Sequence, residues 1–125
     1  MLSDYNNFIF FIKDDEYEEL RKTRLFKLFR SRSRYNISQH DHILFGTKAE
    51  NGEKAIIAEY EVVSTEKIGK GTKISFEPIY NAPKHQGLKL KDLLTLSMSK
   101  SLNLEKSVVK LSEKDFIFLS RKLSQ

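Results

Sequence analysis

The run Phe8-Ile9-Phe10-Phe11-Ile12 is the longest uninterrupted apolar stretch of the chain. Its aromatic and β-branched residues are typical of a strand with both faces covered. Residues 8–12 are therefore predicted to open the domain as a buried β-strand. A run of this length is far too short to cross a bilayer, which takes about 20 residues in a helix.

A group of acidic residues follows this strand and predicts a helix. Asp14 or Asp15 can cap its N-terminus, where the helix dipole favours carboxylates. Tyr17 and Leu20 give the helix one apolar side, and we expect it to end near Arg21.

The middle of the chain has the period of strands, and its Asn-Gly and Gly-Lys-Gly sequences predict turns. Ile56, Ala58, Tyr60 and Val62 are predicted to share one face of a long strand. The predicted strands cover residues 43–45, 54–63 and 73–79, with turns at 50–53 and 69–71. A loop punctuated by prolines and glycine follows, containing Tyr80, Lys84 and His85.

The last third of the chain changes to helical spacing. Leu90, Leu93 and Leu94 predict a helix that starts near Leu88. Residues 108–109 predict a short extended piece. Residues 112–115 (Ser-Glu-Lys-Asp) resemble a capping box, and they head a final helix that carries Phe116, Leu119 and Leu123.

Length and composition indicate a single domain over residues 1–125. The order of elements predicts an α+β fold, a curled antiparallel sheet or partial β-barrel flanked by short helices. Because the chain has no cysteine, a disulfide framework, a zinc ribbon and a thiol nucleophile are excluded. We expect a cytoplasmic protein with no membrane partner, no metal and no cofactor.

Seven basic residues and no acidic one lie between Arg21 and Arg34, with phenylalanines and a tyrosine among and just after them. Arginine grips phosphates and aromatic rings stack on unpaired bases, so the mixture predicts a nucleic-acid surface. The net charge of +5 fits a polyanionic partner. The alternative is a solvated basic face over core residues, and helix and loop remain equally open for this segment. The predicted contacts are Arg24, Lys27, Phe29, Arg30, Arg32, Arg34, Tyr35, Tyr80 and Lys84.

The layout resembles the EVE domain of the PUA-like superfamily, a relative of the YTH readers of methylated adenine. The resemblance extends over nearly the whole chain and is carried by residues 8–20, 37–45, 55–63, 74–80, 88–93 and 111–116. It implies recognition of an unpaired or flipped, possibly modified base of RNA or DNA, with the basic segment holding the phosphates. The chain departs from the family in having no tryptophan, so Phe, Tyr or His would have to line the base pocket.

Two other function classes remain open. Lys22-Thr23, with Glu53 or Glu59 as base, is similar to the lysine-threonine step of the ASCH domains, which implies an RNase or amide hydrolase. A protein-interaction module of a larger complex would need an exposed apolar patch. The cluster His40-Asp41-His42 is interpreted as a surface loop rather than a metal site, because it supplies two imidazoles at most. No catalytic residue is predicted.

Overall fold

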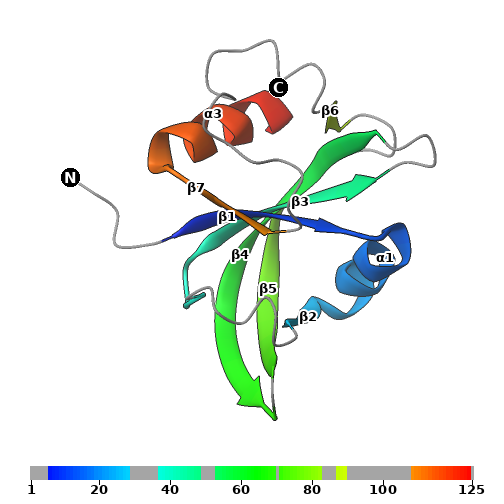
Figure 1. Ribbon diagram of the computed structural model, residues 1–125, viewed down its shortest axis with the longest axis vertical. Helices are drawn as coiled ribbons and strands as arrows, with labels where there is room; N and C mark the ends of the chain where they lie inside the picture. Colours follow the sequence, from blue (N-terminus) through cyan, green and yellow to red (C-terminus); the bar gives the residue numbers. More distant parts are fainter. Residues whose placement is uncertain are drawn as a thin grey trace.

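The computed structural model describes residues 6–28, 37–48, 53–69, 71–82, 87–89 and 108–124. Figure 1 shows a twisted sheet with one helix on each side, in which β1 and β7 run across the long β4–β5 hairpin. The elements are β1 (Asn7–Ile12), α1 (Asp14–Thr23), β2 (Leu25–Leu28), β3 (His42–Lys48), β4 (Lys54–Ile68), β5 (Gly71–Asn81), β6 (Leu88–Lys89), β7 (Val108–Leu111) and α3 (Glu113–Ser124).

The sheet is mixed, with strand order β2-β5-β4-β3-β1-β7 and with β6 paired to β4. The predicted α+β class is confirmed. The prediction of an antiparallel sheet is wrong at one place, because β1 and β3 pair in parallel. Among the described residues β2 and β7 each pair on one side only, so the sheet is not closed into a barrel.

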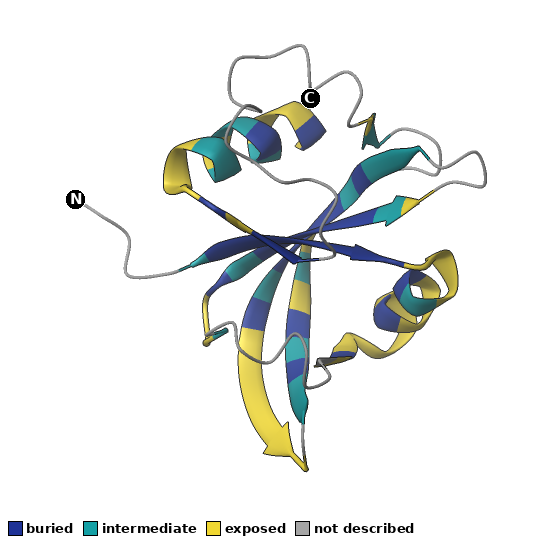
Figure 2. Cartoon of the chain, viewed as in Figure 1, coloured by how far each residue is buried: buried dark blue, intermediate teal, exposed yellow. Residues whose placement is uncertain are grey.

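The predicted opening strand is confirmed, and every residue of β1 is buried (Figure 2). Phe8, Phe10 and Ile12 join a core that also contains Tyr17 and Leu20 of α1. We call this side of the sheet the α1 face. Ile9 and Phe11 join a second core with Leu119 and Leu123 of α3, which defines the α3 face. Two covered faces explain why β1 is apolar at every position rather than at alternate ones.

A β-bulge changes the faces of β4 from those predicted. The register between β3 and β4 passes from Phe45↔Ala58 to Gly46↔Ile56, so Ile57 is an extra residue. Ile56 consequently packs on the α3 face, while Ala58, Tyr60 and Val62 pack on the α1 face. The prediction of one shared face is wrong for Ile56, because a bulge reverses the alternation.

Helix α1 begins one residue earlier than its acidic residues suggested. Lys13 is the N-cap, and its backbone N–H donates a hydrogen bond to the Glu16 carboxylate at 3.0 Å. Asp14 and Asp15 lie in the first turn. Arg24 ends the helix in the left-handed conformation, at φ 58°. Its backbone reversal lets Leu25–Leu28 pair with β5 as a strand, where the spacing had left helix and loop open.

The remaining predictions are confirmed in part. Tyr80 lies inside β5 rather than in the loop predicted to follow residue 79. Leu88 and Lys89 form a strand, so the predicted helix does not start there, and the rest of that prediction, residues 90–96, lies outside the described residues. The turn predicted at 50–53 includes residues outside the described part of the chain. In the turn predicted at 69–71, Gly69 has a left-handed backbone, at φ 56°.

The C-terminal prediction is confirmed. β7 is extended, and Ser112 Oγ accepts a hydrogen bond from the N–H of Asp115 at 3.1 Å at the start of α3. In the described part of the chain, neither helix has the length and apolar character needed to span a membrane.

Candidate functional site

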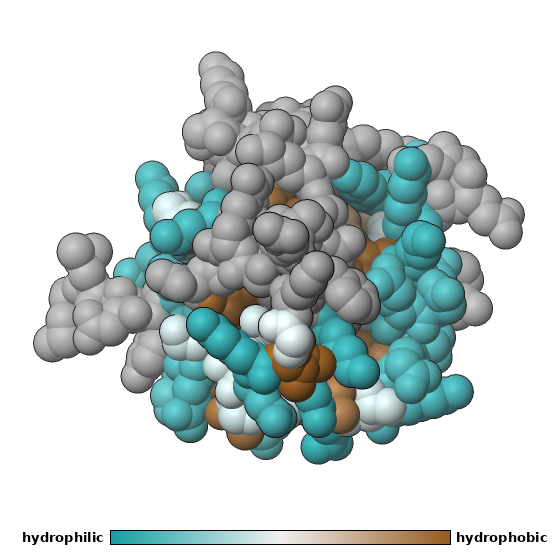
Figure 3. Space-filling model, turned by 60° about the horizontal axis from the view of Figure 1, so that its bottom comes forward, coloured by the Kyte–Doolittle hydropathy of each residue, from teal (hydrophilic) through white to brown (hydrophobic). Residues whose placement is uncertain are grey.

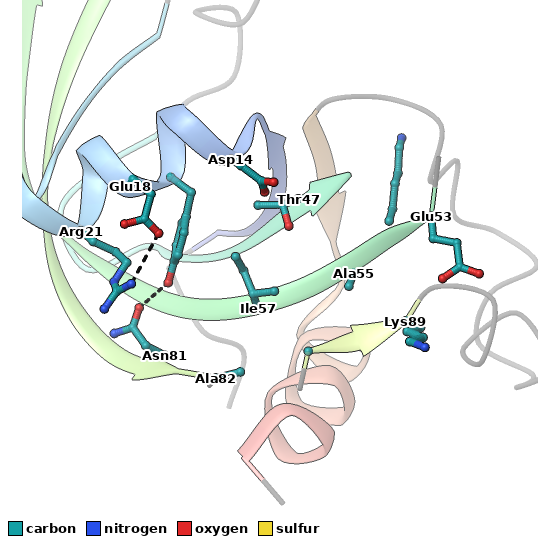
Figure 4. A pocket seen from close by; sticks show the side chains of 13 residues that line it. Asp14, Glu18, Arg21, Thr47, Glu53, Ala55, Ile57, Asn81, Ala82 and Lys89 are labelled. Atoms are coloured by element: carbon teal, nitrogen blue, oxygen red, sulfur yellow. Dashed lines mark hydrogen bonds and ion pairs between the residues drawn. The ribbon is translucent and has the colours of Figure 1, made fainter. Parts of the chain in front are cut away.

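A groove of about 710 Å³ lies between α1 and the ends of the central strands (Figure 4). Helix α1 supplies one wall, and its helical spacing places residues 14, 17, 18 and 21 on the same side. The lining from α1 is Asp14, Tyr17, Glu18 and Arg21, the lining from the strands is Thr47, Lys54, Ala55, Ile57, Asn81 and Lys89, and Glu53, Ala82 and Gly87 next to these strands complete it. The groove therefore has an apolar floor with polar walls.

Asn81 joins the two walls of the groove at one end. It lies opposite Ala58 in the β4–β5 register, so its side chain is on the α1 face. Its Oδ1 accepts a hydrogen bond from the Tyr17 hydroxyl at 2.5 Å and another from the Tyr60 hydroxyl at 3.0 Å. Burial raises the pKa of both phenols, and both therefore remain protonated donors near neutral pH.

The charges around the groove are mixed. Three carboxylates (Asp14, Glu18, Glu53) and three cations (Arg21, Lys54, Lys89) line it. Arg21 Nη1 lies 3.5 Å from Glu18 Oε1, and both side chains are more than half exposed. An exposed pair at that distance is weak, so the Arg21 guanidinium can turn to a ligand at little cost.

Three of the nine predicted contacts lie within the described residues. Arg24 and Lys27 are exposed, at the end of α1 and on the edge strand β2. Tyr80 is half-buried and packs against the core of the α3 face. The structure does not bring these three side chains together, and none of them lines the groove. Phe29, Arg30, Arg32, Arg34, Tyr35 and Lys84 lie outside the described residues.

A second polar cluster lies where α3 meets the sheet. Glu59, which is buried, accepts a hydrogen bond from Ser120 Oγ of α3 and lies 3.0 Å from His42 Nδ1. His42 Nε2 lies 3.4 Å from Glu61, and His40 Nδ1 lies 3.6 Å from the same carboxylate. The hydrogen bond to Glu59 raises the pKa of His42 against the opposing effect of burial. Burial by itself would raise the pKa of Glu59, but the bonds from His42 and Ser120 lower it.

The surface-loop interpretation of the histidine cluster is correct for His40, which is exposed, and wrong for its neighbours. The Asp41 side chain is buried and accepts hydrogen bonds from the backbone N–H groups of Asn6 and Ser38, at 2.9 and 2.8 Å. The His42 side chain is 28% exposed, and the Phe116 ring meets its imidazole edge to face at 5.4 Å. Contacts with residues distant in the sequence, Asn6 for Asp41 and Phe116 for His42, therefore help to set both positions.

The second cluster is a structural bridge rather than a catalytic arrangement. Ser120 donates to the carboxylate of Glu59 and not to His42, so the imidazole is not in place to take its proton. In the parts of the chain that the structure describes, no group of three or more His, Asp or Glu side chains could hold a metal ion.

The residues suggested for an ASCH-like hydrolase are also kept apart. Lys22 and Thr23 end the helix on the α1 face, and the Thr23 hydroxyl donates to the Glu19 carbonyl. Glu59 is on the opposite face, under α3. Glu53 lines the groove, but Lys22 and Thr23 do not.

Sequence reasoning missed Tyr17, Asn81 and Arg21 as groove residues. Tyr17 and Asn81 are 64 positions apart, and nothing in the local pattern around either residue signals a contact across the fold. Arg21 could have been found, because it begins the basic run and lies one turn beyond Tyr17 on the same helix side.

The chain matches no protein family model, and no curated protein sequence is significantly similar to it.

Proposed function

We propose that the chain is a non-catalytic, PUA-like nucleic-acid-binding domain. An unpaired or flipped base of RNA or DNA, modified or not, enters the groove beside α1, and the basic segment that begins at Arg21 holds the flanking phosphates. One observation carries the proposal: Arg21 belongs both to the groove lining and to the run of seven basic residues. A strand held by that run would therefore pass the mouth of the groove.

The lining favours a base over a phosphate inside the groove. The three carboxylates balance the three cations, so the lining has no net positive charge to attract a phosphate, whereas the carboxylates can accept hydrogen bonds from the N–H groups of a neutral base. The floor of Ala55, Ile57 and Ala82 offers an apolar contact for the ring. A volume of about 710 Å³ lies in the range of small-ligand sites and exceeds what one base requires.

Exposed cations continue from the groove toward the edge of the sheet. Arg21 and Lys22 lie in the last turn of α1, and Arg24 and Lys27 follow. All four side chains are exposed. Each one that neutralises a phosphate should release a counterion, so binding should weaken as salt rises.

The described surface offers less support for a protein-interaction module. The exposed large hydrophobic residues come from four different elements: Leu25, Val63, Ile68, Ile79 and Ile117. Figure 3 shows that hydrophilic side chains predominate among those described on the face toward the β4–β5 hairpin. An interface of ordinary size would need a larger continuous apolar area there.

The test is the binding of labelled single-stranded oligonucleotides, followed by fluorescence anisotropy over a range of salt concentrations. The double variant Arg21→Gln/Lys27→Gln should weaken binding and reduce the log-log salt slope by about 1.4, which corresponds to two phosphates. The control Lys110→Gln/Arg121→Gln removes the same charge at exposed positions outside the groove. Equal effects of the two double variants, or binding that does not depend on salt, would contradict the proposal.

A further inference from the structure

We infer that Asn81 acts only as a hydrogen-bond donor toward the base in the groove. It therefore selects a base that presents a carbonyl oxygen. The inference rests on the proposed function and adds a specificity to it. Uracil carries carbonyl groups and no amino group, while adenine carries an amino group and no carbonyl. Uracil should therefore be favoured over adenine.

The amide oxygen of Asn81 faces two hydroxyl groups. An amide oxygen has two lone pairs, and here both are used, because the hydroxyls of Tyr17 and Tyr60 donate to it. In the reverse orientation the NH2 group would donate to the two hydroxyl oxygens, because a phenol also accepts. In the structure it is the amide oxygen that faces the two tyrosines.

The NH2 group then remains for a ligand. Asn81 is exposed and lines the groove. Figure 4 shows its side-chain nitrogen on the side away from the Tyr17 hydroxyl. Arg21, a second pure donor, lies near enough for its charge to act on both phenols. This end of the groove therefore offers two donor groups, and a carbonyl oxygen can accept from both.

In this orientation the amide also excludes the usual way in which asparagine recognises adenine. That contact is bidentate and needs the amide to accept and donate at once. With its oxygen already occupied, Asn81 can only donate. A ring nitrogen of adenine has one lone pair and can accept from one of the two donors, and the adjacent amino group, a donor itself, would face the other donor unpaired. An unpaired polar group is what makes a wrong ligand bind poorly.

The experiment uses single-stranded heptamers in which only the central position carries a base, either uracil or adenine, and the others are abasic. The wild-type chain should bind the uracil strand about three- to tenfold more tightly, as expected for one hydrogen bond. In Asn81→Asp a carboxylate still accepts from both tyrosines but offers no donor. That variant should lose or reverse the preference, and its salt slope should be unchanged.

The control Gln39→Glu adds the same negative charge at an exposed position away from the groove and should keep the preference for uracil. Equal affinity of the wild-type chain for the two strands would overturn the inference and needs no variant. Salt-dependent binding with no change of preference in Asn81→Asp would overturn it while leaving the proposed function intact. Absence of salt-dependent binding to any strand would overturn the proposed function, and the inference with it.

Discussion

At the scale of single residues, His42 and Glu59 stabilise each other's charged forms. Glu59 is buried under α3, where an ionised carboxylate is costly unless it is hydrogen-bonded. His42 and Ser120 supply those bonds, and His42 gains a second carboxylate neighbour in Glu61. The pair therefore ties the docking of α3 to the ionisation of both groups.

The raised pKa of His42 gives this pair a definite pH dependence. The contribution of His42 is complete below the ordinary histidine pKa of about 6.5 and is lost as the pH rises through the raised value. His42→Gln should thus lower the free energy of unfolding by about 1–2 kcal/mol near pH 5.5. The loss should be smaller toward alkaline pH, near pH 9, because the wild-type imidazole gives up its proton as the pH rises through its raised pKa. Urea unfolding at the two pH values measures both.

Two observations check this assignment. His40→Gln, at an exposed position in a longer contact with Glu61, should change stability little at either pH. Glu59 has the opposite pH dependence, because its pKa is lowered. Its contribution to the free energy of unfolding is present above the ordinary glutamate pKa and is lost as the pH falls through the lowered pKa. A His42→Gln effect that grows toward alkaline pH would contradict the assignment.

At the scale of elements, the parallel pairing of β1 and β3 places Gly46 directly beside Phe11. A Cβ added at Gly46 would lie 2.6 Å from two ring carbons of Phe11 and 3.0 Å from the Ala55 carbonyl oxygen. The ring is buried in the core of the α3 face and cannot withdraw freely. Gly46→Ala should cost about 1–3 kcal/mol, as overpacking does, measured by chemical unfolding.

Two further variants identify the cause. Phe11→Leu in the Gly46→Ala background should recover part of the loss, and the double-mutant cycle should show coupling between the two sites. Gly69→Ala is the matched control, since it has open space around the added Cβ and only its φ of 56° opposes a side chain. It should cost about 1 kcal/mol. Full additivity in the Gly46 cycle would contradict the steric explanation.

The elements that sequence reasoning predicted are those set by local chemistry. The apolar run of β1, the acidic first turn of α1 and the Ser112 cap of α3 each carry their own signal. Strands β2 and β6 do not, because pairing with β5 and β4 selects their conformation. The bulge at Ile57 is equally invisible, since one extra residue in a strand leaves the composition unchanged. The groove at Asn81 depends on such long-range placement.

At the scale of the whole molecule, the central strands connect the two cores. Successive residues of β1 and β3 point to opposite faces: Ile43 and Phe45 pack on the α1 face, and Leu44 packs on the α3 face. Loss of either core would remove support from one side of the same strands. We therefore expect the two faces to unfold together in one transition, as single domains of this size commonly do.

Leu119→Ala tests this coupling. Leu119 is buried on α3, and its truncation should lower the free energy of unfolding by about 2–5 kcal/mol. Both cores share β1 and β3, so the truncation should make global opening more frequent. Hydrogen exchange through global opening, measured by mass spectrometry, should therefore become faster in peptides from α1 as well as in those from α3. The control Ile117→Ala, at an exposed position of the same helix, should leave exchange almost unchanged. Acceleration confined to β7 and α3 would show that the α3 face opens independently of the rest.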